Sequence, residues 1–228
     1  MVATKKNNRI ILICIISITV SALAFLLLYY NNRRKEFDYS AHLKEKVLSI
    51  SDMTGEGQTI SIDMQEMAYY IINVEGNIND MAYQYNSKSP AKFWNLKVET
   101  TYTMRDYAKD LAMDSCVRDN IYYIEALKNG MELTEEEKKL ASENAYAIMK
   151  NLTGRQMDLS DFTYEVLYGI ETKLFIASKY ANSLSENGYD KDELELEGSY
   201  YNELRSAYNV SVNEELWDKV EFGNLSIE

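Results

Sequence analysis

An uncharged stretch near the amino terminus constrains this chain more than any other feature. Residues 10–30 read IILICIISITVSALAFLLLYY and contain no charged side chain. A helix of that length is about 30 Å long, which matches the hydrocarbon core of a bilayer. Because only a helix satisfies its own backbone polar groups in lipid, the stretch predicts a membrane-spanning anchor. Tyr29 and Tyr30 close it, as interfacial aromatic residues often do.

The charges around the stretch favour an export topology. Residues 1–9 carry only basic charges, which is typical of an export signal, and every acidic residue of the chain follows the stretch. We therefore expect residues 1–9 in the cytoplasm, a single-pass anchor over 10–30 in a bacterial cytoplasmic membrane, and an extracytoplasmic domain. Cleavage as a signal peptide near Ala24 is the alternative, because Ala22 and Ala24 fit a small-residue cleavage site.

Composition limits the kind of domain that follows. The formal net charge is −12 and the pI is near 4.7, which excludes nucleic acid as an expected partner, because phosphate binding needs Lys and Arg. Cys14 lies in the stretch and Cys116 lies beyond it, so no intrachain disulfide supports the fold. One proline and nine glycines are few for a strand-rich protein and indicate long helices.

Apolar spacing predicts a helical domain over residues 58–222, after a linker over 31–57 and before a tail of residues 223–228. Within the linker, residues 36–50 are compatible with a short helix. The first strong helix starts near Asp63, and its apolar residues recur at spacings of three and four, as in a helix with one buried face. That stripe consists of Met64, Met67, Ile71, Val74, Ile78, Met81 and Tyr85.

Capping patterns predict where the later helices begin and end. A second helix is expected from about residue 100 to 128, where Gly130 can adopt the left-handed cap. A third follows the capping box of Thr134 and Glu137, a fourth starts at residues 158–161, and a fifth runs from Asp190 to about residue 208. Residues 210–212 alternate like a strand, and we expect them to pair with residues 58–60 as a two-stranded ribbon.

The order of these elements carries a resemblance. With the phrases ALKNGMELTEEE at residues 126–137 and DLSD at 158–161, it resembles the N-terminal helical chaperone domain of SurA/PrsA-type extracytoplasmic foldases. The closing segment, with Tyr200, Leu204, Val210 and Trp217, is similar to the segment that completes the chaperone core in that family. The resemblance implies an all-α domain whose core is built from both chain ends, so the closing segment should pack on the first helix.

The chain departs from that family in one respect. Such foldases usually carry a parvulin-type prolyl isomerase module of about 90–100 residues, a size typical of a small domain. Fewer than twenty residues separate Ala181 from Tyr200, and His42 is the only histidine. Only the chaperone part of the resemblance therefore carries over to this chain, and we expect no isomerase activity.

The sequence gives little support for a metal site, a catalytic triad or a reactive cysteine. One histidine cannot build a His-rich metal site or a catalytic triad. The acidic run from Asp190 to Glu197 lacks the glycine that a calcium-binding EF-hand loop needs at its sixth position. Cys116 has no neighbouring base in the sequence and is interpreted as a small core residue. We predict neither catalytic residues nor a metal or other cofactor.

Tyrosine doublets are the most unusual feature of the domain. Adjacent helical residues point about 100° apart, so one member of each doublet should lie at a core edge or on the surface. Boundary packing is one interpretation. The other is a surface of tyrosine and flexible methionine side chains that binds apolar segments of other proteins. The candidate client-binding residues are Met64, Met67, Tyr69, Tyr70, Tyr122, Tyr123, Tyr200 and Tyr201.

These observations together predict a membrane-anchored, extracytoplasmic protein without enzymatic activity. The expected function is chaperone-like, with unfolded or partner polypeptides as ligands. The alternative is a structural or assembly protein of the cell envelope that binds one dedicated partner through the same domain.

Overall fold

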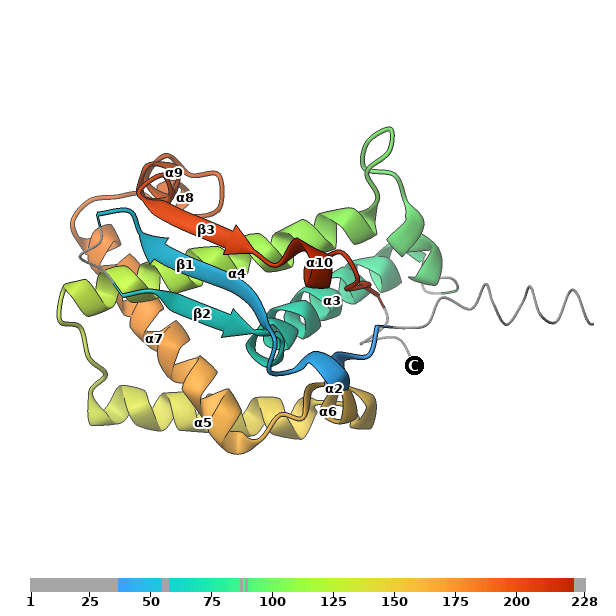
Figure 1. The fold of residues 1–228 in the computed structure, drawn as a ribbon, viewed down its shortest axis with the longest axis horizontal. Coiled ribbons are helices and arrows are strands. Elements are labelled where there is room, and N and C mark those ends of the chain that lie inside the picture. Colours follow the sequence, from blue (N-terminus) through green and yellow to red (C-terminus); the bar gives the residue numbers. More distant parts are fainter. Residues whose placement is uncertain (1–36, 55–57, 87, 89, 224–228) are drawn as a thin grey trace, which may run out of the picture. The chain divides into compact units, whose positions relative to one another are not determined.

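The structure is a computed structural model that describes residues 37–54, 58–86, 88 and 90–223 (Figure 1). The expected anchor over residues 10–30 and the cytoplasmic residues 1–9 lie outside this part of the chain. Among the described residues, no helix is both long and apolar enough to cross a membrane. The compact unit that contains the domain begins at Phe37.

Four long helices form the body of the domain, as expected. Thr103 and Thr134 each cap a helix with a full capping box, and Gly130 adopts a positive φ of 65° after the second long helix. The end of the second long helix and the start of the third were therefore predicted well, while the second begins at Met104, later than the expected residue 100. The long helices are α3 (Met64–Asn86), α4 (Met104–Lys128), α5 (Glu135–Asn151) and α7 (Tyr164–Glu186).

Two of the helix predictions need correction. The segment at residues 158–161 ends a short helix instead of starting the fourth long one, which is capped by Thr163. The fifth helix is broken in two, because Glu197 has a φ of 70° and Gly198 starts a new turn. The short helices are α2 (Tyr39–His42), η1 (Pro90–Asn95), α6 (Gly154–Ser160), α8 (Lys191–Leu194), α9 (Ser199–Arg205) and α10 (Glu214–Trp217).

The domain is mostly helical, but the all-α expectation is wrong in detail because a three-stranded sheet is present. Its central strand, β1 (Lys46–Asp52), lies where residues 36–50 were expected to form a linker and a helix. β1 pairs antiparallel with β2 (Ile60–Asp63) on one side and β3 (Tyr208–Val212) on the other. The expected ribbon of residues 58–60 with 210–212 is also wrong, since Ile50 lies between Ile60 and Val210.

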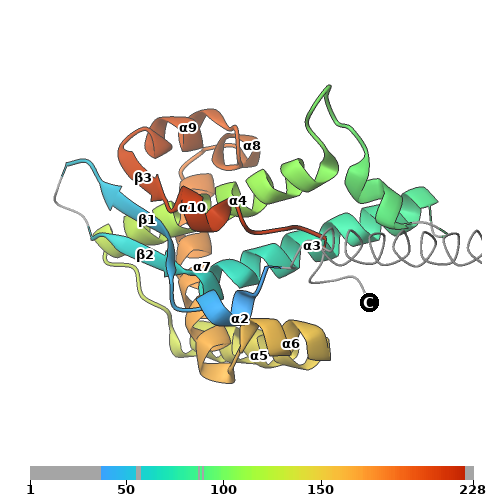
Figure 2. The ribbon, with the colours of Figure 1, turned by 45° about the vertical axis from the view of Figure 1, so that its right-hand side comes forward.

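The sheet brings the two ends of the domain together over the helices. Leu48 and Ile50 of β1 are buried in the same core as Ile71 of α3 and Ile121 of α4. In Figure 2, α5 and α6 lie on the other side of α3 from the sheet. A smaller core there joins Ala68 of α3 to residues of α5 and α7.

The closing segment packs into the main core, as expected. Trp217 is 6% exposed, and its ring lies 6.0 Å from that of Phe222. The backbone N–H of Gly223 donates a 2.6 Å hydrogen bond to the buried Glu75 Oε1 on α3. The first-helix stripe is buried as far as Ile78 and the buried face continues through Ala82, whereas Met81 and Tyr85 are exposed.

Candidate functional site

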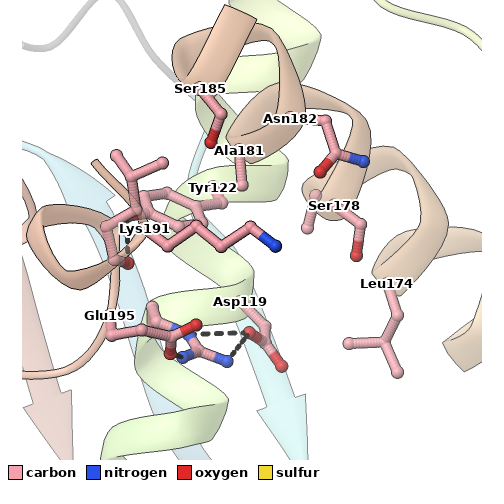
Figure 3. Close-up of a pocket in the computed structure, with 12 residues that line it drawn as sticks. Asp119, Tyr122, Leu174, Ser178, Ala181, Asn182, Ser185, Lys191 and Glu195 are labelled. Carbon is pink, nitrogen blue, oxygen red and sulfur yellow. Dashed lines mark hydrogen bonds and ion pairs between the residues drawn. The ribbon is translucent and has the colours of Figure 1, made fainter. Parts of the chain in front are cut away.

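A groove between α4, α7 and α8 is a candidate site (Figure 3). Its volume is about 460 Å³. Tyr122, Leu174, Ala177, Ala181 and Leu194 provide apolar walls. The polar rim consists of Arg118, Asp119, Ser178, Asn182, Ser185, Lys191 and Glu195. A ligand in this groove would therefore meet both apolar and hydrogen-bonding side chains.

Charges of both signs meet at one end of the groove. Arg118 on α4 donates hydrogen bonds of 3.2 and 3.1 Å to Asp119 Oδ1, and its other terminal nitrogen binds Glu195 after α8. Burial raises the pKa of Asp119, and the neighbouring Arg118 opposes that rise. Lys191 extends from α8 towards α7, and it forms no ion pair with any residue that the structure describes. The groove is thus polar at its rim without a strong net charge.

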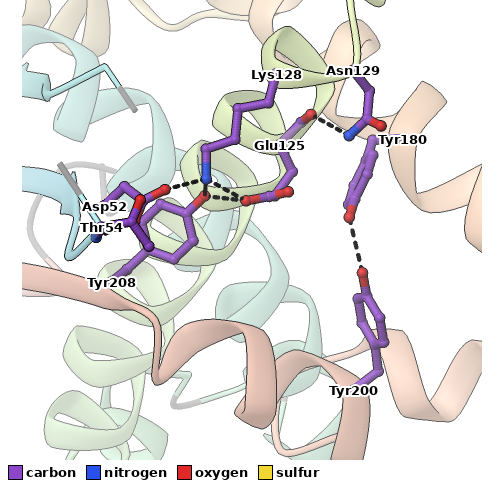
Figure 4. A network of polar contacts seen from close by, with 8 residues as sticks. All are labelled: Asp52, Thr54, Glu125, Lys128, Asn129, Tyr180, Tyr200 and Tyr208. Atoms are coloured by element: carbon purple, nitrogen blue, oxygen red, sulfur yellow. Dashed lines mark hydrogen bonds and ion pairs between the residues drawn. The ribbon is translucent and has the colours of Figure 1, made fainter. Parts of the chain in front are cut away.

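Tyrosines hold the α8–α9 wall of the groove against the long helices. Tyr122 on α4 donates a 2.6 Å hydrogen bond to the Leu194 carbonyl, and its ring lies 5.8 Å from Tyr180 and 6.1 Å from Tyr201. The hydroxyls of Tyr180 and Tyr200 are 2.8 Å apart, which joins α7 to α9 (Figure 4). Burial raises the pKa of Tyr201 to about 12.

A second polar network fastens β1 and β3 to α4 next to these tyrosines (Figure 4). Lys128 on α4 donates to the Asp52 carboxylate, to Glu125 at 2.8 Å and to the Tyr208 hydroxyl at 3.0 Å. The hydrogen bond from Lys128 lowers the pKa of Asp52 to about 2, helped by the 2.7 Å bond from the Thr54 backbone N–H. These contacts position α4, which contributes one wall of the groove.

A neighbouring hollow of about 700 Å³ lies on the α5 side of α7. Leu174, Ser178 and Asn182 line both cavities, so this ridge of α7 separates them. Within the hollow Lys179 binds Glu137 at 2.8 Å, and this ion pair links α7 to the start of α5. The two cavities thus lie on either side of one ridge of α7.

The structure does not bring the predicted client-binding residues together as a surface. Met64 and Met67 are completely buried and Tyr70, Tyr122 and Tyr201 nearly so, because they form the core between α3, α4 and the closing segment. The expected methionine and tyrosine surface is therefore wrong as a binding face. Of the remaining three, Tyr69 is half-buried and donates a 2.7 Å hydrogen bond to Glu171, while Tyr123 and Tyr200 are half-buried as well.

The expectation for the doublets is confirmed in its simpler form. In each of the three doublets that the structure describes, one ring is buried and the other lies at the edge of the core. Only Tyr122 of the predicted residues lines the main groove. The other groove residues were missed, since Arg118, Asp119, Ser178 and Asn182 are ordinary polar residues of a helix surface and no spacing distinguishes them.

We searched the described residues for metal sites and for a reactive thiol. They contain no cluster of three His, Cys, Asp or Glu side chains that could hold a metal ion. Cys116 is completely buried in the core, which confirms its interpretation as a small core residue, and burial raises the pKa of its thiol well above the usual value.

We compared the chain with known protein families, curated proteins and solved structures. No protein-family model, no curated protein and no solved structure matches this chain. The resemblance to SurA/PrsA-type foldases therefore stays a prediction from the sequence, and the function is argued from the groove itself.

Proposed function

We propose that this protein is a membrane-anchored, extracytoplasmic polypeptide-binding protein that acts in a chaperone-like manner without catalysis. The groove between α4, α7 and α8, with apolar walls and a polar rim, is the observation that carries the proposal. It replaces the methionine and tyrosine surface as the place where a client would bind. The anchor over residues 10–30 and the resemblance to foldase chaperone domains belong to the same proposal.

The lining of the groove suits an extended peptide segment. Apolar walls favour an apolar client side chain, since burial of apolar surface drives most binding. Asn182, Ser178 and Ser185 sit at the rim and have both donors and acceptors, which match peptide N–H and C=O groups. A rim with balanced charges does not select one charged sequence, which suits a binder of varied clients.

Crosslinking from the groove in intact cells tests the proposal. A photoreactive phenylalanine analogue at Asn182, in the full-length chain, should give adducts with many proteins. The same analogue at Glu165, an exposed position on the same helix outside both cavities, should give few. A single abundant adduct from residue 182 would favour the dedicated-partner alternative, and equal yields from both positions would contradict a binding groove.

A substitution that fills the groove should weaken the binding of polypeptides, which is a second test of the proposal. Asn182→Trp places a large ring on an exposed position of the rim and should reduce by about tenfold or more the retention of an unfolded polypeptide, a loss of about 1.4 kcal/mol in binding. Glu165→Trp is the control for a new tryptophan on the same helix. Unchanged retention by the Asn182 variant would argue against the groove.

The non-enzymatic part of the proposal has its own test. Uncatalysed prolyl isomerisation takes tens of seconds, and the purified full-length chain should leave that rate unchanged in a peptide assay. A rate above the uncatalysed one would require an active site and would overturn this part of the proposal.

A further inference from the structure

At one end of the acidic domain, a stretch of sequence carries only basic charges, although Asp80, Glu99 and Asp106 lie beside it. Residues 81–98 contain no Asp or Glu, whereas the whole chain has a net charge of −12. Lys88, Lys92 and Lys97 lie in this stretch and are exposed. None of the three has an ion pair with another residue of the described parts of the chain. We call the described residues of 81–98 the basic end; Asp80 and Glu99 flank it in sequence.

The basic end also exposes large apolar side chains. Met81 is 48% exposed, Tyr85 67% and Val98 50%, although most apolar residues of α3 are buried. In Figure 1 this green part of the chain, from the end of α3 to the loop before α4, projects beyond the sheet and the other helices. Exposed aromatic and apolar groups beside lysines are typical of surfaces that bind the interface of a membrane.

The basic end is held firmly by the core behind it. Trp94 of η1 is completely buried and donates a 2.9 Å hydrogen bond to Asn79 Oδ1 on α3. Arg105 lies 5.7 Å above the Trp94 ring, and the Tyr85 ring lies 5.5 Å from that of Phe93. Lys92 of η1 and Tyr85 of α3 therefore project from packed elements, so little order is lost when they contact a surface.

We propose that the basic end docks the domain onto the anionic surface of its own membrane. Lysines near an anionic bilayer are attracted to it, and three of them orient a tethered domain without anchoring it alone. The rest of the domain carries an excess of acidic residues and is repelled by such a surface, which leaves the basic end as the favoured contact. The bilayer is the occupant that matches both the charge and the exposed apolar groups.

The short segment between the expected anchor and the domain supports the bilayer as the binding partner of the basic end. Only six residues separate Tyr30, the end of the expected anchor, from Phe37, where the compact unit begins. Six residues span at most about 20 Å, so the membrane surface is always within reach of the domain. This inference therefore rests on the proposed function, which includes a membrane anchor over residues 10–30.

Docking through the basic end also determines where the groove lies. Arg118 follows Met104 by fourteen residues along α4, which starts next to the basic end. Since a helix rises about 1.5 Å per residue, the groove lies roughly 20 Å farther along α4. A docked domain would thus keep the groove clear of the headgroups and open to clients.

The test uses the full-length chain in lipid nanodiscs, with Tyr85→Cys carrying a polarity-sensitive fluorophore. Labelled protein without that substitution corrects for any reaction at Cys14 or Cys116. The emission should shift to the blue in discs that contain phosphatidylglycerol, relative to pure phosphatidylcholine, and the shift should weaken as salt is raised. The combined Lys88→Glu, Lys92→Glu and Lys97→Glu variant should lower the docked-to-undocked ratio at least about tenfold.

The control carries the same charge change on exposed lysines elsewhere: Lys139→Glu, Lys150→Glu and Lys219→Glu. It should keep most of the lipid-dependent shift. Equal emission in both lipids, or equal loss in both triple variants, would overturn docking through the basic end while leaving the anchor intact. A chain that is not retained by the discs would contradict the anchor itself, and with it this inference.

Discussion

At the scale of single residues, the polar contacts that matter most join segments far apart in the chain. Asp52 at the end of β1 and Lys128 at the end of α4 are ion-paired, and Tyr208 of β3 joins them. The side chain of Asp52 is only 4% exposed, so its charge depends on these partners. A buried carboxylate that loses its partner, or its own charge, weakens the sheet at the point where the two chain ends meet.

The lowered pKa of Asp52 makes its contribution depend on pH. A carboxylate whose pKa is lower in the folded state stabilises the fold above its unfolded pKa of about 3.9, and the stabilisation disappears as pH falls towards the folded value. For Asp52, with a folded pKa of about 2, the window runs from about pH 4 down to about pH 2. Asp52→Asn should lower the melting temperature clearly at pH 6 and much less at pH 2.5. A difference that is equal at both pH values, measured by circular dichroism, would contradict this role.

Substitution of Trp217 tests whether the closing segment contributes to the stability of the core. Its ring is 6% exposed, packs edge-on against Phe222 and lies 5.3 Å below the Lys109 amine. Trp217→Ala should cost about 3–5 kcal/mol of unfolding free energy, because it leaves a large cavity. Tyr83→Ala, at a side chain that is 58% exposed, should cost less than about 0.5 kcal/mol and serves as the control. Denaturant titration of both variants compares them, and equal losses would place Trp217 outside the core.

At the scale of elements, the short helices α8 and α9 are held in place by side chains of α4 and α7. Tyr122 and Tyr180 reach it from α4 and α7, and Arg118 binds Glu195 at its end. The chain turns back between the two short helices at Glu197 and Gly198, where φ is positive at Glu197. The shape of the groove therefore depends on this turn as well as on the tyrosines.

Gly198→Ala should disturb the groove wall through this turn. A Cβ at residue 198 would lie 2.3 Å from the Glu193 carbonyl oxygen and 2.4 Å from that of Asp192, so the backbone of α8 would have to move. We expect a lower melting temperature and a weaker crosslinking yield from Asn182. Gly169→Ala is the matched control, since nothing lies within 4 Å of its Cβ position and alanine favours a helix. Equal behaviour of the two variants would show that the turn does not set the wall.

At the scale of the whole molecule, the domain is a single unit closed by its two ends. The central strand β1 lies near the start of the described chain and β3 near its end, and the two pair from Leu48 with Val212 to Asp52 with Tyr208. The proposed function places this unit outside the cytoplasm with the groove available to clients, and the docking proposal turns the basic end towards the membrane. The arrangement depends first on the topology of the amino-terminal stretch.

A reporter enzyme fused after Glu228 tests that topology. It should be active only outside the cytoplasm, and the protein should stay with membranes through a carbonate wash, because an uncharged stretch of 21 residues is long enough to span the bilayer. Activity inside the cytoplasm would reverse the orientation. Release into the soluble fraction with a new amino terminus near Ala24 would instead establish the cleaved-signal alternative.

The sequence by itself determined the features that depend on near neighbours in the chain. The box of Thr134 with Glu137 joins residues three apart, so the start of α5 is readable without the fold. The periodic stripe of α3 likewise identified a buried helix face and the burial of Ile71 and Ile78. These interactions lie within one or two helical turns, and their geometry follows from the helix itself.

The tertiary structure alone decided the sheet, the role of the tyrosines and the groove. β1 is a strand because β2 and β3 supply its hydrogen-bond partners, and β3 lies about 160 residues later in the chain. Tyr70 and Tyr122 are core residues because helices distant in sequence cover them. The groove arises where α4, α7 and α8 meet, and since packing between distant segments sets which side chains stay exposed, no local pattern could have located it.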